Sequence, residues 1–337
     1  ARDIVNYNLT QWTSGSAFAS SGARFVNWNN ATFQADPNAQ GQCFCTTAGN
    51  APGVFDNFGL VIKSSYAAFR SYFTMVFNNN GASALVSSTA GNLALAGGGS
   101  STSSRYEAGT GGQVSFDGSD NTDQHTLATT CRLTGSGNFK FTGGVSNVFA
   151  DLQSTNDPIV DGGVVNFREG VKFTSFGPTL RVSAGTANFE QLPVPFPAIA
   201  LTGGTLDLED WNVTIASGAQ SNGVLQGSGR VTIPGAYTWS GGNMGGAGTT
   251  VFDGTLQILT GTVAFGFSRP VINNNLTQWI GGNGVGIDAG VFVNSPNALF
   301  EIVQPAGTGF SITLSGSNQA RFENHGVVRS RGAAVSA

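Results

Sequence analysis

The sequence predicts an all-β chain folded as a right-handed parallel β-helix, or β-solenoid, and three observations lead to this prediction. Short segments alternate apolar and polar residues along most of the chain. A triplet of an apolar residue, any residue and Asn recurs at steps of 21, 22 and 30 residues. Residues 1–70 also align on residues 268–337 without a gap. Stacked coils of similar length account for all three observations, because each coil repeats the strands and corners of its neighbour.

The alternating segments indicate short β-strands. Segments such as QVSFDG, NFKFTGG, VNFREG, TLRVSAG and RVTIPG are bounded by Gly, Asn, Ser or Asp, as expected for strands that end in turns. No stretch combines a sustained period of 3.6 residues with helix caps. Only Ser64–Phe73 and part of Asp151–Asp161 are candidates for a short helix.

The apolar-x-Asn triplets set the length of one coil. Residues i and i+2 of a strand share a face, so the apolar residue and the Asn are expected to point inward together. We expect the phenylalanines to stack in the core and the asparagines to form a side-chain ladder at a corner. Alternatively, Asn stands there as a good turn residue. The predicted core and ladder residues are Phe25, Asn27, Phe55, Asn57, Phe77, Asn79, Phe292, Asn294, Phe322 and Asn324. The general chirality rule predicts a right-handed coil.

The gapless alignment indicates a tandem repeat of about 267 residues. RDIVNYNLTQW aligns on RPVINNNLTQW, and 22 of the 70 aligned pairs are identical. We therefore predict one full repeat at residues 1–267 and the start of the next, continuous with it, at 268–337. Neither end of the sequence resembles the polar cap of a repeat array, so we expect the chain to be a segment of a longer tandem polymer. The alternative is a protein whose two ends happen to be duplicated.

The composition favours an ordered, nearly uncharged chain. Charged residues make up 10% of the sequence, the net charge is −4, and there are 49 glycines. The absence of a basic patch argues against a nucleic-acid partner. No run of 18 apolar residues exists, so no membrane span is expected. With 40% hydrophobic residues and 25 phenylalanines, the chain has the material for a continuous core.

One segment carries a resemblance. GVLQGSGRVTIPGAYTWSGGNMGGAGTTVFDGTLQI (Gly223–Ile258) and the VFDNFG type of triplet resemble the Gly/Thr/Asn-rich β-solenoid repeats of very large secreted surface and structural proteins. The resemblance is close over this segment and loose over most of the chain. It implies a long extracellular rod with a structural, adhesive or surface-coating role. The additional Phe and Trp residues, the Cys-Phe-Cys triplet and the irregular coils between Thr102 and Pro197 depart from the pattern.

No constellation of residues predicts catalysis, a cofactor or a metal. Polysaccharide lyases and hydrolases of the β-helix type need clustered Asp, Lys, Arg or His in one groove. His325 aligns with Phe58 of the first copy, and His125 lies in a polar segment that we read as a solvated loop, with a weak cation site as the alternative. Asp207 and Glu209 are expected on one face of a strand, as solubility residues. We therefore predict that the chain is not an enzyme.

The three cysteines predict no disulfide framework. Cys43 and Cys45 are neighbours on one strand face, where we expect them to be poorly placed to bridge each other. Their partners in the second copy are Phe310 and Ile312, which favours small core side chains. Cys131 is about four coils away, and an intermolecular bridge is the alternative.

Four Asn-x-Ser/Thr sequons are possible glycosylation sites if the chain is secreted by a eukaryote. They begin at Asn8, Asn30, Asn212 and Asn275. Asn8 and Asn275 occupy the same place in the two copies, whereas the sequon of Asn30 is lost in the second copy, where Leu299 replaces the threonine. An incidental sequon beside a strand anchored by Trp12 or Trp279 is the alternative.

These features predict an extracellular or cell-surface structural protein, a segment of a repetitive filament or surface rod. Its expected partners are copies of itself stacked end to end along the solenoid axis, together with possible covalent glycans. The alternatives are an adhesive or glycan-binding surface protein and, less favoured, a polysaccharide lyase or hydrolase. An ice-binding surface would need Thr-x-Thr in register on successive coils, and only scattered threonines such as Thr129 and Thr130 are present.

Overall fold

The computed structural model describes residues 3–19, 22–46, 51–118, 122–259, 265–281, 285–304, 312–315 and 320–332. Over these residues it confirms the prediction of an all-β parallel β-solenoid, with about 13 turns and no helix. Accordingly, nothing in these ranges is a helix of the length and apolar character needed to cross a membrane. The chain divides into two compact units, Ala1–Leu180 with Gly185–Pro193 and Arg181–Ala184 with Val194–Ala337.

In the first unit the coils build three parallel ladders, and most coils supply one strand to each ladder. The first ladder contains β1 (Asp3–Asn6), β4 (Arg24–Asn27), β7 (Val54–Asn57), β10 (Val76–Asn80), β13 (Gly99–Thr102) and β16 (Gln124–Leu127). The second contains β2 (Leu9–Trp12), β5 (Thr32–Ala35), β8 (Leu60–Lys63), β11 (Leu85–Ser88), β14 (Arg105–Ala108), β17 (Arg132–Gly135), β19 (Asp151–Ser154) and β21 (Lys172–Phe176). The third contains β3 (Ala17–Ala19), β6 (Cys43–Thr46), β9 (Arg70–Phe73), β12 (Gly91–Leu95) and β15 (Gly112–Phe116).

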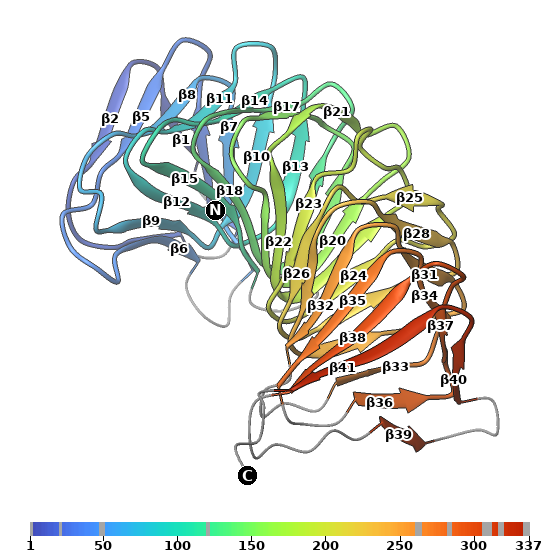
Figure 1. The fold of residues 1–337 in the computed structure, drawn as a ribbon. Coiled ribbons are helices and arrows are strands. Elements are labelled where there is room, and N and C mark those ends of the chain that lie inside the picture. Colours follow the sequence, from blue (N-terminus) through green and yellow to red (C-terminus); the bar gives the residue numbers. More distant parts are fainter. Residues whose placement is uncertain are drawn as a thin grey trace. The chain divides into compact units, whose positions relative to one another are not determined.

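Two longer strands close this unit. β18 (Asn138–Val148) pairs with β15 through its first half and with β16 through its second half, so it joins the third ladder to the first. β20 (Ile159–Phe167) pairs with β18 in parallel along most of its length. The residues of the next strand, β22 (Thr179–Phe189), belong to both units. The row formed by β2, β5, β8, β11, β14 and β17 shows the regular stacking in Figure 1.

The second unit has the same three-ladder plan. One ladder contains β23 (Ala198–Leu201), β26 (Gly218–Gln220), β29 (Tyr237–Trp239), β32 (Thr255–Leu259), β35 (Leu276–Ile280), β38 (Leu299–Gln304) and β41 (Val327–Gly332). The next contains β24 (Thr205–Asp207), β27 (Val224–Gln226), β30 (Gly242–Met244), β33 (Phe265–Phe267), β36 (Val285–Asp288) and β39 (Ile312–Ser315). The last contains β25 (Val213–Thr214), β28 (Arg230–Ile233), β31 (Thr249–Phe252), β34 (Val271–Asn273), β37 (Val291–Asn294) and β40 (Arg321–Asn324).

The two short helices considered at Ser64–Phe73 and Asp151–Asp161 are absent, so that expectation is wrong. Residues 70–73 form β9, and residues 151–154 form β19. In β9 the side chains of Ser71 and Phe73 are buried, and its backbone pairs with β12 on one side and β6 on the other. Strands of neighbouring coils therefore satisfy the backbone groups that a helix would have satisfied internally.

Candidate functional site

Asparagine side chains link four successive coils at one corner of the first unit. The Nδ2 atom of Asn6 donates to Oδ1 of Asn27, that of Asn27 to Asn57, and that of Asn57 to Asn79, each over 2.8 Å. All four side chains are buried. Each Nδ2 also donates to a strand-opening carbonyl of the following coil: Thr32, Leu60, Leu85 and Arg105. The corner is therefore fixed by side-chain amides that run parallel to the backbone ladders.

A second asparagine ladder lies in the second unit. Asn273 Nδ2 donates to Asn294 Oδ1 over 2.8 Å, and Asn294 Nδ2 donates to Asn324 Oδ1 over 2.7 Å. The steps of 21 and 30 residues equal those from Asn6 to Asn57 in the first ladder. Asn324 is exposed, and its Nδ2 donates to the carbonyl of Gly326 instead of to a further asparagine.

The phenylalanines of the triplets stack ring on ring beside these asparagines. Phe55 lies between Phe25 and Phe77, with centroid distances of 4.9 and 5.0 Å and interplanar angles of 15° and 6°. All three rings are buried. Phe292 and Phe322 form the matching pair in the second unit at 5.4 Å and 6°, and there Phe322 is only half-buried. Within each stack a ring covers the one before it, and Phe322, the last ring of the second stack, remains partly exposed.

The coils at the two ends of the described chain expose inward-facing positions. We call residues 3–12 the first end coil and residues 321–332 the last end coil. Ile4 pairs in register with buried Phe25 but is 61% exposed, whereas Val271, its counterpart in the second copy, is 0% exposed. Val328 pairs with buried Phe300 but is 45% exposed, whereas its counterpart Val61 is 0% exposed. The equivalent positions inside the described chain are closed because a further coil covers them.

The four sequon asparagines, Asn8, Asn30, Asn212 and Asn275, are all exposed. Asn212 differs from the others because its Oδ1 accepts a hydrogen bond from the backbone N–H of Arg230 over 2.8 Å. Asn30 adopts a left-handed backbone conformation, with φ of 65°. Exposure of the side-chain amide is the property that a modified asparagine needs in the folded chain.

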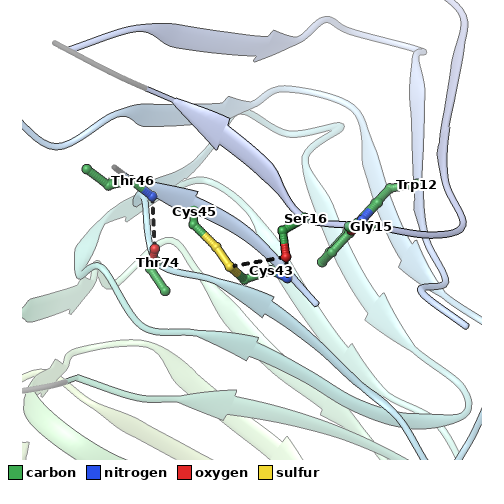
Figure 2. The surroundings of a disulfide bond; sticks show 7 residues. All are labelled: Trp12, Gly15, Ser16, Cys43, Cys45, Thr46 and Thr74. Carbon is green, nitrogen blue, oxygen red and sulfur yellow. Dashed lines mark hydrogen bonds between the residues drawn. A yellow bond between two sulfur atoms is a disulfide. The ribbon is translucent and has the colours of Figure 1, made fainter. Parts of the chain in front are cut away.

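Cys43 and Cys45 are joined by a disulfide within β6, so the expectation that they would be poorly placed to bridge each other is wrong (Figure 2). Their Cα atoms are 5.3 Å apart, inside the usual range for a disulfide. Both side chains extend from the same face of the strand, Cys43 half-buried and Cys45 buried. Residues that flank the neighbouring strands β3 and β9 also hold this segment, since the N–H of Cys43 donates to Ser16 Oγ and that of Thr46 to Thr74 Oγ1. Cys131 is free and buried.

His125 and the pair Asp207 and Glu209 lie in surroundings that differ from those predicted from the sequence. His125 lies in β16, buried against Phe116, with Nε2 3.0 Å from the carbonyl oxygen of Asp117. The solvated-loop interpretation is therefore wrong, and burial lowers the pKa of His125 to about 4. Asp207 and Glu209 do not share a strand face, because β24 ends at Asp207 and Glu209 has a φ of 51°. The carboxylate of Asp207 accepts the N–H of Glu209 and so stabilises a turn.

One surface groove of about 560 Å³ in the first unit brings carboxylates together. Its lining includes Glu169 and Glu190 with Arg168 and Asn147. Arg168 forms an ion pair with Glu190 and donates from Nε and Nη2 to Asn147 Oδ1 over 3.0 and 2.8 Å. Glu190 is therefore engaged in a hydrogen-bonded network. No group of three or more His, Cys, Asp or Glu side chains within the described ranges has the arrangement of a metal site.

Two features were missed in the sequence, although each had a signal. Arg269 is fully buried and donates to the carbonyls of Gly245 and Gly229 over 3.0 and 2.9 Å, so one guanidinium ties its coil to the two coils before it. The signal was the arginine at the aligned position of the first copy, Arg2.

The second missed feature is aromatic. An aromatic residue follows each of Asn6, Asn27 and Asn57, and these exposed or half-exposed rings form a column on the outside of the corner.

No protein-family model, curated protein or solved structure matches the chain.

Proposed function

We propose that the chain is a segment of an extracellular structural rod or filament that extends by stacking coil on coil. The observation that carries this proposal is the equal coil geometry of the two copies, whose asparagine ladders advance by the same steps of 21 and 30 residues. Ile4 and Val328 occupy inward positions that are closed wherever a further coil covers them, as at Val271 and Val61. Covering such side chains contributes about 25 cal/mol for each Å² of apolar surface removed from water. Another coil of the same kind is the covering that these positions fit.

The backbone of an open coil supports the same proposal. A strand at the end of a ladder presents unpaired N–H and C=O groups, which pair readily with a further strand. β1 and β41 each have one strand partner in the described chain, β4 and β38 respectively. The low overall charge of −4 gives little repulsion between approaching ends. Hydrogen bonds and apolar contacts would thus be gained together when a coil is added.

The register of the two copies supports a repetitive rod. β4 and β37, β7 and β40, and β8 and β41 each begin at positions that the alignment of residues 1–70 with 268–337 makes equivalent. The asparagine ladders have equal steps in the two copies. A rod built from such repeats grows without a change of coil geometry, which suits a structural, extracellular role.

Association of the purified chain tests the proposal. Ile4→Glu combined with Val328→Glu places a charge at an inward-facing position of both end coils. We expect wild-type particles to lengthen with concentration in electron micrographs and in sedimentation, and this double variant to stay monomeric. Val194→Glu is the matched control, because Val194 is exposed and lies outside both end coils. Equal association of the double variant and the control would refute stacking through the end coils.

A further inference from the structure

Three aromatic side chains form a column on the outside of the asparagine corner. Tyr7, Trp28 and Phe58 directly follow Asn6, Asn27 and Asn57 in sequence. The ring centroids of Tyr7 and Trp28 are 6.3 Å apart, and those of Trp28 and Phe58 are 5.9 Å apart. Tyr7 is 72% exposed and Trp28 51% exposed. Large apolar side chains gathered on a surface in this way commonly mark a place where another group binds.

The second copy shows that the fold does not require these rings. The equivalent positions hold Asn274, Ser295 and His325. Asn274 Nδ2 donates to Asp253 Oδ1 over 2.8 Å, and Ser295 Oγ donates to Asn274 Oδ1 over 2.7 Å. Hydrogen-bonded polar side chains thus occupy the equivalent corner in the second copy. The corner can therefore form without aromatic rings at these positions.

The turn that follows Trp28 is the same in both copies. The N–H of Ala31 donates to the carbonyl of Trp28 over 3.0 Å, with Asn30 at φ of 65°. In the second copy the N–H of Ala298 donates to the carbonyl of Ser295 over 3.0 Å, with Asn297 at φ of 69°. The two turns have equivalent asparagines in equivalent conformations.

The sequences of these turns differ at three of five positions, and two of these differences bear on modification of the asparagine. The first copy reads Trp-Asn-Asn-Ala-Thr, and the second reads Ser-Pro-Asn-Ala-Leu. The aromatic ring and the sequon hydroxyl are both present in the first copy and both absent in the second. The side chain of Asn30 is exposed and makes no hydrogen bond to the described part of the chain. Its amide is therefore available for modification beside an exposed indole.

We propose that Asn30 carries an N-linked glycan whose first sugar ring packs against Trp28. The amide nitrogen of Asn30 would form a bond to C1 of a sugar supplied by a polyprenyl-pyrophosphate donor. The bond from C1 to the pyrophosphate oxygen breaks, the pyrophosphate leaves, and the amide nitrogen loses one proton. This proposal rests on the secretory location in the proposed function, but it does not depend on stacking of the end coils.

The packing has a simple physical basis. A pyranose ring has an apolar face of C–H groups, and contact with an indole removes apolar surface of both from water. Trp28 and Asn30 are two residues apart within one closed turn, so ordering the sugar there costs less conformational entropy than a contact between distant groups. A glycan on this corner also lies beside the coil, away from the inward-facing positions of the end coils.

Secretion from a eukaryotic cell line tests attachment. We expect peptide mass spectra to show a glycan on Asn30 that is lost on enzymatic deglycosylation and absent from Asn30→Gln. The midpoint of thermal unfolding should fall on deglycosylation of the wild type. In Trp28→Ser, which carries the residue of the second copy, the glycan should remain attached and this fall should be much smaller. An unmodified Asn30 would overturn the proposal, and an equal fall in both proteins would overturn the contact with Trp28.

A graft into the second copy provides the reciprocal test, independent of how Trp28→Ser folds. Leu299→Thr completes a sequon at Asn297, and Ser295→Trp adds the ring. We expect a glycan in both the single and the double variant, with a rise of the unfolding midpoint on glycosylation only in the double variant. A rise of equal size in both would contradict the proposal.

Binding to a resin tests the alternative of a free polysaccharide. Retention of the unglycosylated wild type, but not of Trp28→Ser, on a neutral β-glucan resin would assign the column to a free polysaccharide instead. Filament formation by Asn30→Gln would show that the proposed rod does not depend on the glycan, so the two proposals can fail separately.

Discussion

Asn57 lies inside the first asparagine ladder, where its side chain both accepts and donates. Oδ1 accepts from Asn27 Nδ2 and from the N–H of Gly59, while Nδ2 donates to Asn79 Oδ1 and to the carbonyl of Leu85. The side chain is fully buried. Removing it would leave buried donors and acceptors in two neighbouring coils without a partner.

Asn57→Ala is expected to lower the free energy of unfolding by about 3 kcal/mol, because unsatisfied buried polar groups cost about 1–3 kcal/mol each. Asn324→Ala is the matched control, since Asn324 occupies the equivalent position but is exposed. Its cost should be under about 1 kcal/mol. Denaturant unfolding measures both values, and similar losses in the two variants would show that the ladder does not stabilise the corner.

His125 makes stability depend on pH. Its ring is buried beside Phe116, near the Asp117 carbonyl, and a hydrogen bond with the Leu95 backbone and the Asp123 carboxylate both act in the opposite direction to burial. Burial lowers the pKa to about 4, below the ordinary value of 6.5. The unfolded chain therefore binds a proton at a higher pH than the folded chain does, and stability is lost as the pH falls from about 6.5 to about 4.

Between pH 7 and pH 5 this group should remove about 2 kcal/mol from the free energy of unfolding. His125→Phe should lose that part of the pH dependence, whatever its absolute stability. His325→Gln should retain it, because His325 is exposed. Denaturant unfolding at the two pH values gives the comparison, and an unchanged pH dependence in His125→Phe would rule out the buried neutral imidazole.

Among the elements, the stacked phenylalanines connect strands of successive coils. Phe55→Ala should cost about 3–5 kcal/mol, since it opens a cavity in a closed stack. Phe322→Ala, the equivalent change, should cost clearly less because Phe322 is half-buried. Thermal and denaturant unfolding measure the difference. A larger loss in Phe322→Ala would contradict the view that each ring depends on the next coil for its cover.

The strands and coil lengths could be predicted because their signals are local and repeated. Alternation marks each strand, and the triplets fix the coil step, so the parallel solenoid followed from residues such as Phe25 and Asn27. The sequence of β9 left helix and strand open, because Arg70–Phe73 is fixed as a strand by its pairing with β12 and β6 in the neighbouring coils. Burial of His125 likewise depends on Phe116 in another strand. The Cys43–Cys45 bridge was missed because an argument from strand geometry alone excluded it.

At the scale of the whole molecule, the account requires that repeats continue one another. The handedness and the repeat of about 267 residues are predictions from the sequence, and the proposed rod depends on the second of these. Most steps between coils are 19–22 residues, and a few are 26–30 residues, which places roughly 10–13 coils in one repeat; adjacent strands are about 4.8 Å apart. One repeat should therefore advance the rod by roughly 50–60 Å.

Electron microscopy of the native material measures this advance most directly. The account predicts thin filaments with an axial repeat of about 50–60 Å, the length of one stacked set of coils. Compact particles of uniform size with covered ends, or filaments with no periodicity near that spacing, would contradict it.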